Sequence, residues 1–187
     1  MFDIVGQAHM AQGSSTTFVT DLLGNANSAL AFNGGYTQVP SGVYFNTPTY
    51  AISLWIKPQQ VGTWARIIDF GNGSPLDNIV FSQANGASVN PLLTAFVNGA
   101  WLTLTPSSLS LVLGEWQFLV GTFDGSKLNV FLNGALISSV SVSYTPAFIN
   151  RAYNYVGKSN FNDGYSYSFI DDLKFYNKVS NLSILFN

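Results

Sequence analysis

Residues 166–180 read S-Y-S-F-I-D-D-L-K-F-Y-N-K-V-S, an alternating run of aromatic and aliphatic residues that contains Asp171 and Asp172 at its centre. Alternation with a period of two predicts a β-strand. A carboxylate inside a strand is costly to bury unless it is hydrogen-bonded or bound to a metal ion. We therefore expect a partner for at least one acid. Because neighbouring strand residues point to opposite faces, the two acids cannot share one substrate.

The same alternation recurs along the chain between clusters of turn residues. It predicts about a dozen strands, over residues 29–32, 36–39, 51–57, 66–70, 78–82, 92–97, 101–105, 116–123, 128–132, 135–142, 153–158 and 167–176. The triplet Asn33-Gly34-Gly35 is expected to form the turn between the first two. No helical stretch separates the strands, so we expect an all-β fold of the sandwich or barrel type.

The composition excludes several classes of protein. The chain has 187 residues, a length typical of one β domain, and only 9% of them are charged. A net charge of −2 offers no basic surface for nucleic acid, and no apolar run is long enough to insert into a membrane. There is no cysteine, and residues 1–10 lack the features of a signal peptide. The low charge is compatible with self-association.

Four blocks of the sequence resemble laminin-G-like domains of the concanavalin A-like lectin/glucanase superfamily. They are residues 23–34 (LGNANSALAFNG), 52–58 (ISLWIKP), 116–134 with its W…TFDG…FLNG pattern, and the 166–180 strand. The resemblance spans residues 18–180 and implies an antiparallel jelly-roll β-sandwich of two sheets over residues 18–187. Residues 1–17 would then be an N-terminal arm, or an edge strand with a linker. The resemblance also implies an extracellular or cell-surface location.

The resemblance further implies a structural Ca²⁺ ion, since jelly-roll relatives often bind one through an aspartate of the last strand and backbone carbonyls near the first. The matching residues are Asp171, with Gly34 or Gly35 as carbonyl donors. Ca²⁺ accepts such hard oxygen ligands. The alternative is that Asp171 accepts hydrogen bonds from backbone N–H groups and that no metal is bound.

A glycan site is the second hypothesis, because sugar sites combine exposed aromatic rings with Asn and Asp side chains. The candidate residues are Trp64, Asp69, Asn72, Asn78, Trp101 and Tyr165. The alternative is packing: most aromatic residues belong to the core, and Arg66 and Asp69 would simply pair with each other. The loop 161–167 (FNDGYSY) suits a binding tip or an interface, although turn formation alone explains its Asn-Asp-Gly.

Catalysis is not expected. Glycoside hydrolysis requires two carboxylates on either side of the bond, and the family's hydrolases place glutamates on one strand. This chain has a single glutamate, Glu115, and its only histidine, His9, lies in the N-terminal arm. Asp69 and Asp77 could converge, but nothing in the sequence requires it.

Two functions remain open. The first is a non-catalytic recognition module, lectin-like or adhesive, that binds a glycan or a protein surface through its loops. The second is a structural subunit of a fibre or appendage, in which the strand-like Phe2–Val5 segment adds to the sheet of a neighbouring copy. In a secreted protein, the sequons at Asn72 and Asn181 are candidate glycosylation sites.

Overall fold

The computed structural model describes residues 9–11, 13–74, 76–102 and 107–179, and these residues form strands and loops without a helix. The strands are β1 (Thr16–Val19), β2 (Ala29–Gly35), β3 (Thr37–Val39), β4 (Gly42–Val43), β5 (Tyr50–Pro58), β6 (Arg66–Gly71), β7 (Asn78–Ser82), β8 (Leu92–Val97), β9 (Ala100–Trp101), β10 (Gln117–Phe123), β11 (Lys127–Leu132), β12 (Ala135–Ser141), β13 (Asn150–Arg151), β14 (Tyr153–Val156) and β15 (Ser166–Tyr176). In this part of the chain, no helix suited to crossing a membrane is found.

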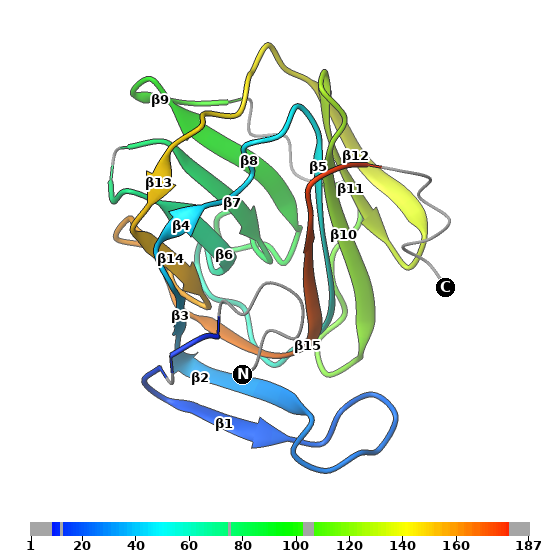
Figure 1. The fold of residues 1–187 in the computed structure, drawn as a ribbon. Helices are drawn as coiled ribbons and strands as arrows, with labels where there is room; N and C mark the ends of the chain where they lie inside the picture. Colours follow the sequence, from blue (N-terminus) through cyan, green and yellow to red (C-terminus); the bar gives the residue numbers. More distant parts are fainter. Residues whose placement is uncertain (1–8, 12, 75, 103–106, 180–187) are drawn as a thin grey trace.

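The strands form two large antiparallel sheets that face each other (Figure 1). One sheet has the order β1-β2-β15-β5-β10-β11-β12, and the other has the order β3-β14-β6-β7-β8-β9, while β13 and β4 form a small separate pair. Consecutive strands such as β2 and β3 lie in different sheets. The predicted all-β sandwich of jelly-roll type is confirmed.

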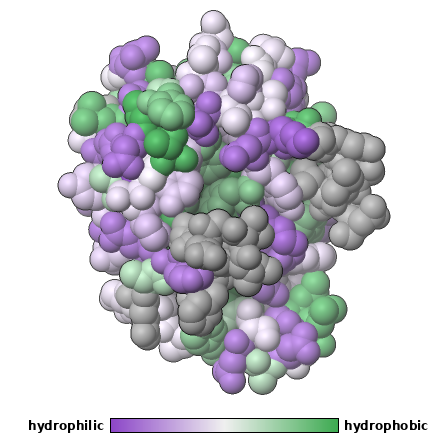
Figure 2. All heavy atoms as spheres, viewed as in Figure 1, coloured by the Kyte–Doolittle hydropathy of each residue, from purple (hydrophilic) through white to green (hydrophobic). Residues whose placement is uncertain are grey.

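The core lies between the two sheets and is filled by the apolar positions of the alternating pattern. In β5, Ile52, Leu54 and Ile56 are completely buried and face this core, as do Ile79 and Phe81 of β7. Each such side chain contributes about 1.5–3 kcal/mol by burial. The outer face of the seven-stranded sheet holds a smaller apolar cluster around Ala51 and Val120. On the face shown in Figure 2, hydrophilic and near-neutral residues dominate and hydrophobic residues form separate small groups.

One predicted turn is wrong. Asn33, Gly34 and Gly35 continue β2 and do not connect a hairpin, because β2 pairs with β15 as far as Gly35. The two glycines lie where this pairing is irregular, because the register of β15 shifts between Ser166 and Tyr167. Gly34 has a φ of 73° and lies under the Tyr167 ring, so that a Cβ atom at Gly34 would be 2.6 Å from the Tyr167 hydroxyl. The sequence pattern signalled positive φ correctly but assigned it to the wrong structure.

The N-terminal region is partly described. β1 pairs with β2 as an edge strand, so the expected boundary between residues 17 and 18 falls inside β1. Residue Ala11 forms an isolated bridge with Gln38. Phe2–Val5 lie outside the described residues, as does the sequon at Asn181. The division at residue 17 and the self-assembly through Phe2–Val5 both stay predictions.

Candidate functional site

The outer face of the six-stranded sheet carries an unusual concentration of polar and aromatic side chains. Residues paired across neighbouring strands share a face. Phe96 of β8 lies opposite both Asn78 of β7 and Trp101 of β9, while Ser82 lies opposite Arg66 of β6. Ile79 and Phe81 alternate with these positions and point into the core. The loop between β14 and β15, residues 157–165, folds over this outer face.

A small pocket of about 200 Å³ opens between this loop and the sheet. Its lining consists of Trp64, Arg66, Trp101, Phe161 and Asp163. The rings of Trp101 and Phe161 have centroids 4.9 Å apart. The volume is below the roughly 300 Å³ at which pockets for drug-sized ligands begin, so the pocket has room for about one ring.

Arg66 organises the pocket. Its Nη2 donates to Asp163 Oδ2 at 2.6 Å, and its Nη1 donates to Ser82 Oγ at 2.6 Å. The guanidinium carbon lies 5.7 Å from the ring centroids of both Trp64 and Trp101, within the range of a cation–π interaction. The Arg66 side chain is only 4% exposed, so it supports the aromatic walls from below.

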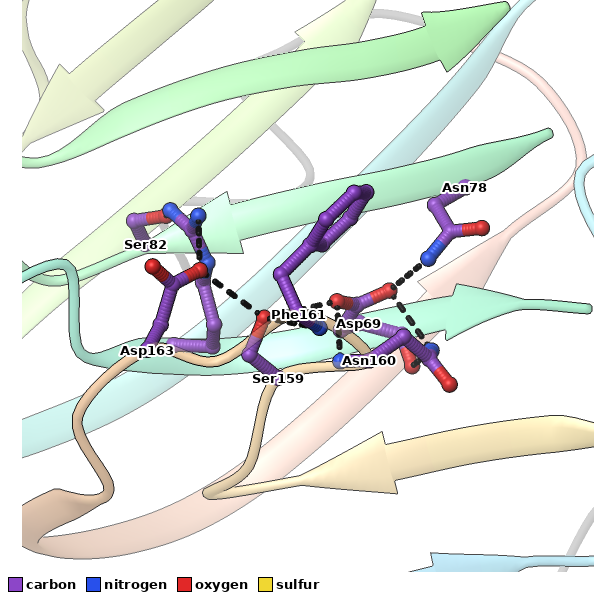
Figure 3. A network of polar contacts seen from close by, with 8 residues as sticks. Asp69, Asn78, Ser82, Ser159, Asn160, Phe161 and Asp163 are labelled. Atoms are coloured by element: carbon purple, nitrogen blue, oxygen red, sulfur yellow. Dashed lines mark hydrogen bonds and ion pairs between the residues drawn. The ribbon is translucent and has the colours of Figure 1, made fainter. Parts of the chain in front are cut away.

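Beside the pocket, Asp69 anchors the loop through a buried network (Figure 3). Its Oδ1 accepts hydrogen bonds from Asn78 Nδ2 at 2.8 Å and Asn160 Nδ2 at 2.9 Å. Its Oδ2 accepts from the Asn160 backbone N–H at 2.7 Å and is 3.2 Å from Ser159 Oγ, which also lies 3.0 Å from Asp163 Oδ2. Burial raises the pKa of Asp69, while the hydrogen bonds from Asn160 and Asn78 and the charge of Arg66 oppose this effect.

Trp64 is held in a strained backbone conformation. Its φ is 55°, in the left-handed region that bulky residues rarely occupy. Such a conformation costs of order 1–3 kcal/mol and persists only where the surroundings maintain it. Here the Trp64 N–H donates to Gly86 O at 2.8 Å, and Gly164 N donates to Thr63 O at 2.9 Å. In this conformation Trp64 lines the pocket.

The structure brings together only part of the predicted glycan set. Trp64 and Trp101 line the same pocket, whereas Asp69 and Asn78 are completely buried beside it and serve to position the loop. Tyr165 lies elsewhere on the face, near Tyr36 with ring centroids 6.4 Å apart. Asn72, the described sequon residue, accepts a hydrogen bond from Ala152 N at 2.9 Å and does not line the pocket.

Three pocket residues were missed by the sequence reasoning: Arg66, Phe161 and Asp163. The expected pairing of Arg66 with Asp69 is not formed as an ion pair, because Arg66 binds Asp163 from a segment 97 residues away. The only sequence signal for the other two was the aromatic, glycine-bearing loop 161–167.

The predicted calcium ligands are not gathered at one place. Gly35 lies opposite Ser166, so Asp171 is five residues farther along β15, roughly 16 Å away. Asp171 Oδ1 instead accepts the Asp172 backbone N–H at 2.8 Å, and partial burial raises the pKa of Asp171. Across the described ranges, no group of three His, Asp or Glu side chains could hold a metal ion. Asp171, Gly34 and Gly35 therefore do not fit a Ca²⁺ site, and calcium binding itself stays a prediction.

The family of this fold follows from comparison with known proteins. A laminin-G-type family model, described as the concanavalin A-like lectin/glucanases superfamily, matches residues 32–183. The chain belongs to this superfamily. The predicted resemblance is thus confirmed, and the pocket lies within the matched region of this lectin/glucanase-like domain. No curated protein sequence matches the chain.

Solved structures share the fold of this lectin/glucanase-like domain at low sequence identity. Domain 4 of a GH43 extracellular arabinanase from Geobacillus stearothermophilus, in complex with arabinotriose, has a TM-score of 0.76 and 22% identity over 94% of this chain and 81% of that one. The binding domain of Paraclostridial Mosquitocidal Protein 1 has a TM-score of 0.71 and 16% identity, over 100% and 49% of the two chains.

A third structure with this fold is that of botulinum neurotoxin type C, whose cell entry depends upon interaction with two ganglioside molecules. It has a TM-score of 0.65 and 13% identity over 96% of this chain. This chain covers 45% of that structure, so it spans about half the length of both toxin structures. At these identities the similarity concerns the fold alone.

Proposed function

We propose that this domain is a non-catalytic glycan-binding module that holds one sugar ring in the pocket between Trp64 and Trp101. The observation that carries the proposal is the arrangement of two indoles and the Phe161 ring around a single ion pair at an open pocket. Ligand sites commonly combine apolar or aromatic walls with a few placed polar groups. Sugar rings have apolar C–H faces and hydroxyl edges, and they fit such a lining.

The charges in the pocket favour a neutral sugar. The Arg66 guanidinium is neutralised by Asp163, so an ionic ligand would compete with this pair. No described residue donates a hydrogen bond to the second carboxylate oxygen of Asp163, Oδ1, which leaves it available to accept a bond from a hydroxyl group. The side chain of Asp163 is 17% exposed, enough for one such contact.

The carboxylates support binding rather than hydrolysis. Glycosidases need two carboxyl groups on either side of the glycosidic bond, about 5–10 Å apart. Asp163 is the only acid among the described residues that line the pocket. The neighbouring Asp69 is completely buried, and both of its oxygens are occupied by donors of the protein. Glu115 lies in the turn before β10, in the other sheet.

Related folds are consistent with this role. The arabinanase domain with the same fold was solved in complex with arabinotriose. The cell entry of botulinum neurotoxin type C, whose structure shares the fold, depends upon interaction with two ganglioside molecules. By analogy with these proteins, the module acts outside the cell, where it attaches itself or a larger protein to a glycan surface.

Binding to a panel of neutral trisaccharides, including arabinotriose, cellotriose and maltotriose, tests the proposal by NMR titration of the labelled protein. We expect at least one sugar to shift signals of Trp64, Trp101 and Phe161. Trp64→Ala and Trp101→Ala should abolish these shifts, while Trp116→Ala, which alters a half-buried tryptophan outside the pocket, should preserve them. Unchanged binding by the two pocket variants would rule the site out.

A further inference from the structure

A second aromatic surface lies on the same outer face, where β14 pairs with β6. We call it the tyrosine patch, and it consists of Tyr36, Tyr153, Tyr155 and Tyr165 around Lys158. Tyr36 and Tyr155 meet edge to face with centroids 5.4 Å apart, and Tyr36 is 6.4 Å from Tyr165. Tyr153 and Tyr165 are 48% and 40% exposed. Packing does not account for so much exposed tyrosine surface at one place.

The tyrosine patch and the pocket share no residue. Tyr155 of β14 lies opposite Asp69 of β6, and Trp101 is on β9 at the far edge of the same sheet. Four strand spacings separate β14 from β9, which corresponds to about 19 Å. Asp69 and Asn78 of the buried network (Figure 3) belong to β6 and β7, two of the strands between β14 and β9. A ligand held by Tyr155 and Lys158 would therefore lie away from Trp101, whereas Tyr165 lies beside the segment of Trp64, because Gly164 N donates to Thr63 O.

Lys158 gives the patch an unpaired positive charge. Its ammonium nitrogen lies 4.6 Å from the ring centroids of both Tyr36 and Tyr155. Among the described residues, the ion pairs are those of Arg66 with Asp163 and of Lys174 with Asp172, so no carboxylate pairs with Lys158. The nearby acid Asp69 is enclosed, and its oxygens accept bonds from Asn78 and Asn160. The charge that this surface presents to solvent is thus positive.

From this juxtaposition we infer that the tyrosine patch is a second ligand site, for a sugar that carries a carboxylate or sulfate group. The anionic group binds the Lys158 ammonium, which two tyrosine rings hold in place, and the sugar ring lies against the exposed Tyr153 and Tyr165. Tyrosine combines an apolar ring with a hydroxyl group that can donate to sugar oxygens. The site differs in charge from the pocket, where the cation is already neutralised.

Three probes on one scaffold test the inference: lactose, 3′-sialyllactose and lactose 3′-sulfate, titrated into labelled full-length protein and followed by NMR. We expect at least one acidic probe to shift the Lys158 side-chain signals and the tyrosine ring signals, and lactose to shift neither. Because the contact is ionic and exposed, its affinity should fall between 50 and 500 mM NaCl. Lys158→Gln should lower the affinity for the acidic probe about fivefold, which is equivalent to about 1 kcal/mol of binding free energy.

The control variants separate the two sites. Trp101→Ala, at the far edge of the sheet, should leave binding of the acidic probe unchanged, and Lys158→Gln should leave binding of neutral trisaccharides unchanged. The inference is overturned if neither acidic probe shifts the patch at 50 mM NaCl, if lactose binds there equally well, or if the shifts fall on Trp64 and Trp101. None of these outcomes depends on whether the pocket binds neutral sugars.

Discussion

The carboxylate of Asp163 binds the guanidinium of Arg66 at 2.6 Å, and this single ion pair joins the loop after β14 to the first residue of β6. The same guanidinium lies 5.7 Å from the centroids of Trp64 and Trp101. This ion pair therefore links both aromatic walls to the loop that closes the pocket, which the Asp69 network also anchors. The integrity of the candidate sugar site depends on it.

Replacing Asp163 by Asn tests the energetic weight of this pair. The variant keeps the shape of the side chain but leaves Arg66, which is 4% exposed, without a counter-charge. We expect a loss of about 3 kcal/mol in the free energy of unfolding, the low end for a broken buried pair. Urea denaturation measures this loss.

The second ion pair among the described residues provides the control. Lys174 and Asp172 also meet at 2.6 Å, but their side chains are 51% and 46% exposed. Lys174→Gln should therefore cost about 0–1 kcal/mol. Equal losses for Asp163→Asn and Lys174→Gln would show that Asp163 does not stabilise a buried charge.

The strands were predictable from sequence, and the pocket was predictable only in part. A run of apolar residues bounded by turn residues is a local signal, and it placed β7 at its observed bounds, Asn78–Ser82, although all five of its residues are buried. The pairing of Arg66 with Asp163 depends on how the start of β6 meets a loop 97 residues away, which no local pattern contains. Trp64 and Trp101 were identified by residue type alone, and the same criterion included Tyr165, which the fold places in the tyrosine patch.

Asp69→Asn tests the buried network. The N–H groups of Asn78 and Asn160 face Asp69 Oδ1, and the Asn160 backbone N–H faces Oδ2, so an amide NH₂ group at either oxygen position would face an N–H donor. A buried polar group without a partner costs about 1–3 kcal/mol. We expect a lower melting temperature and faster amide exchange at Asn160, whose N–H binds the carboxylate. Unchanged exchange at Asn160 would contradict this role of Asp69.

The Asp69→Asn variant also tests how the contribution of Asp69 to the free energy of unfolding depends on pH. Burial raises its pKa above the ordinary value of 3.8, so the folded chain takes up this proton more readily than the unfolded chain. The contribution of Asp69 to stability is therefore full below pH 3.8 and is lost as the pH rises through the folded-state pKa. The stability difference between wild type and Asp69→Asn should shrink over that range. A difference that grows with pH would mean that the hydrogen bonds outweigh burial.

The backbone strain at Trp64 predicts that glycine is a more stable replacement than alanine at this position, the reverse of the usual order. Glycine adopts a φ of 55° without a steric penalty, whereas alanine does not. Trp64→Gly should therefore be more stable than Trp64→Ala by about 1 kcal/mol. Trp101 has no positive φ, so there the order should reverse, with Trp101→Ala the more stable variant. Thermal unfolding of the four variants measures both orders, and the same order at both positions would refute the strain.

Two glycines with nearly equal φ separate steric crowding from backbone strain near the tyrosine patch. Gly157 has a φ of 86° and Gly134 one of 85°, but a Cβ atom at Gly157 would lie 2.5 Å from the Phe32 ring, whereas at Gly134 it would meet nothing within 4 Å. Gly134→Ala should cost about 1 kcal/mol from strain alone. Gly157→Ala should cost about 1–3 kcal/mol more, because the new methyl group overpacks the core. Since Gly157 directly precedes Lys158, Gly157→Ala should also shift the Lys158 side-chain signals in NMR spectra. Equal losses in the free energy of unfolding for the two variants would show that the Phe32 ring moves aside without cost.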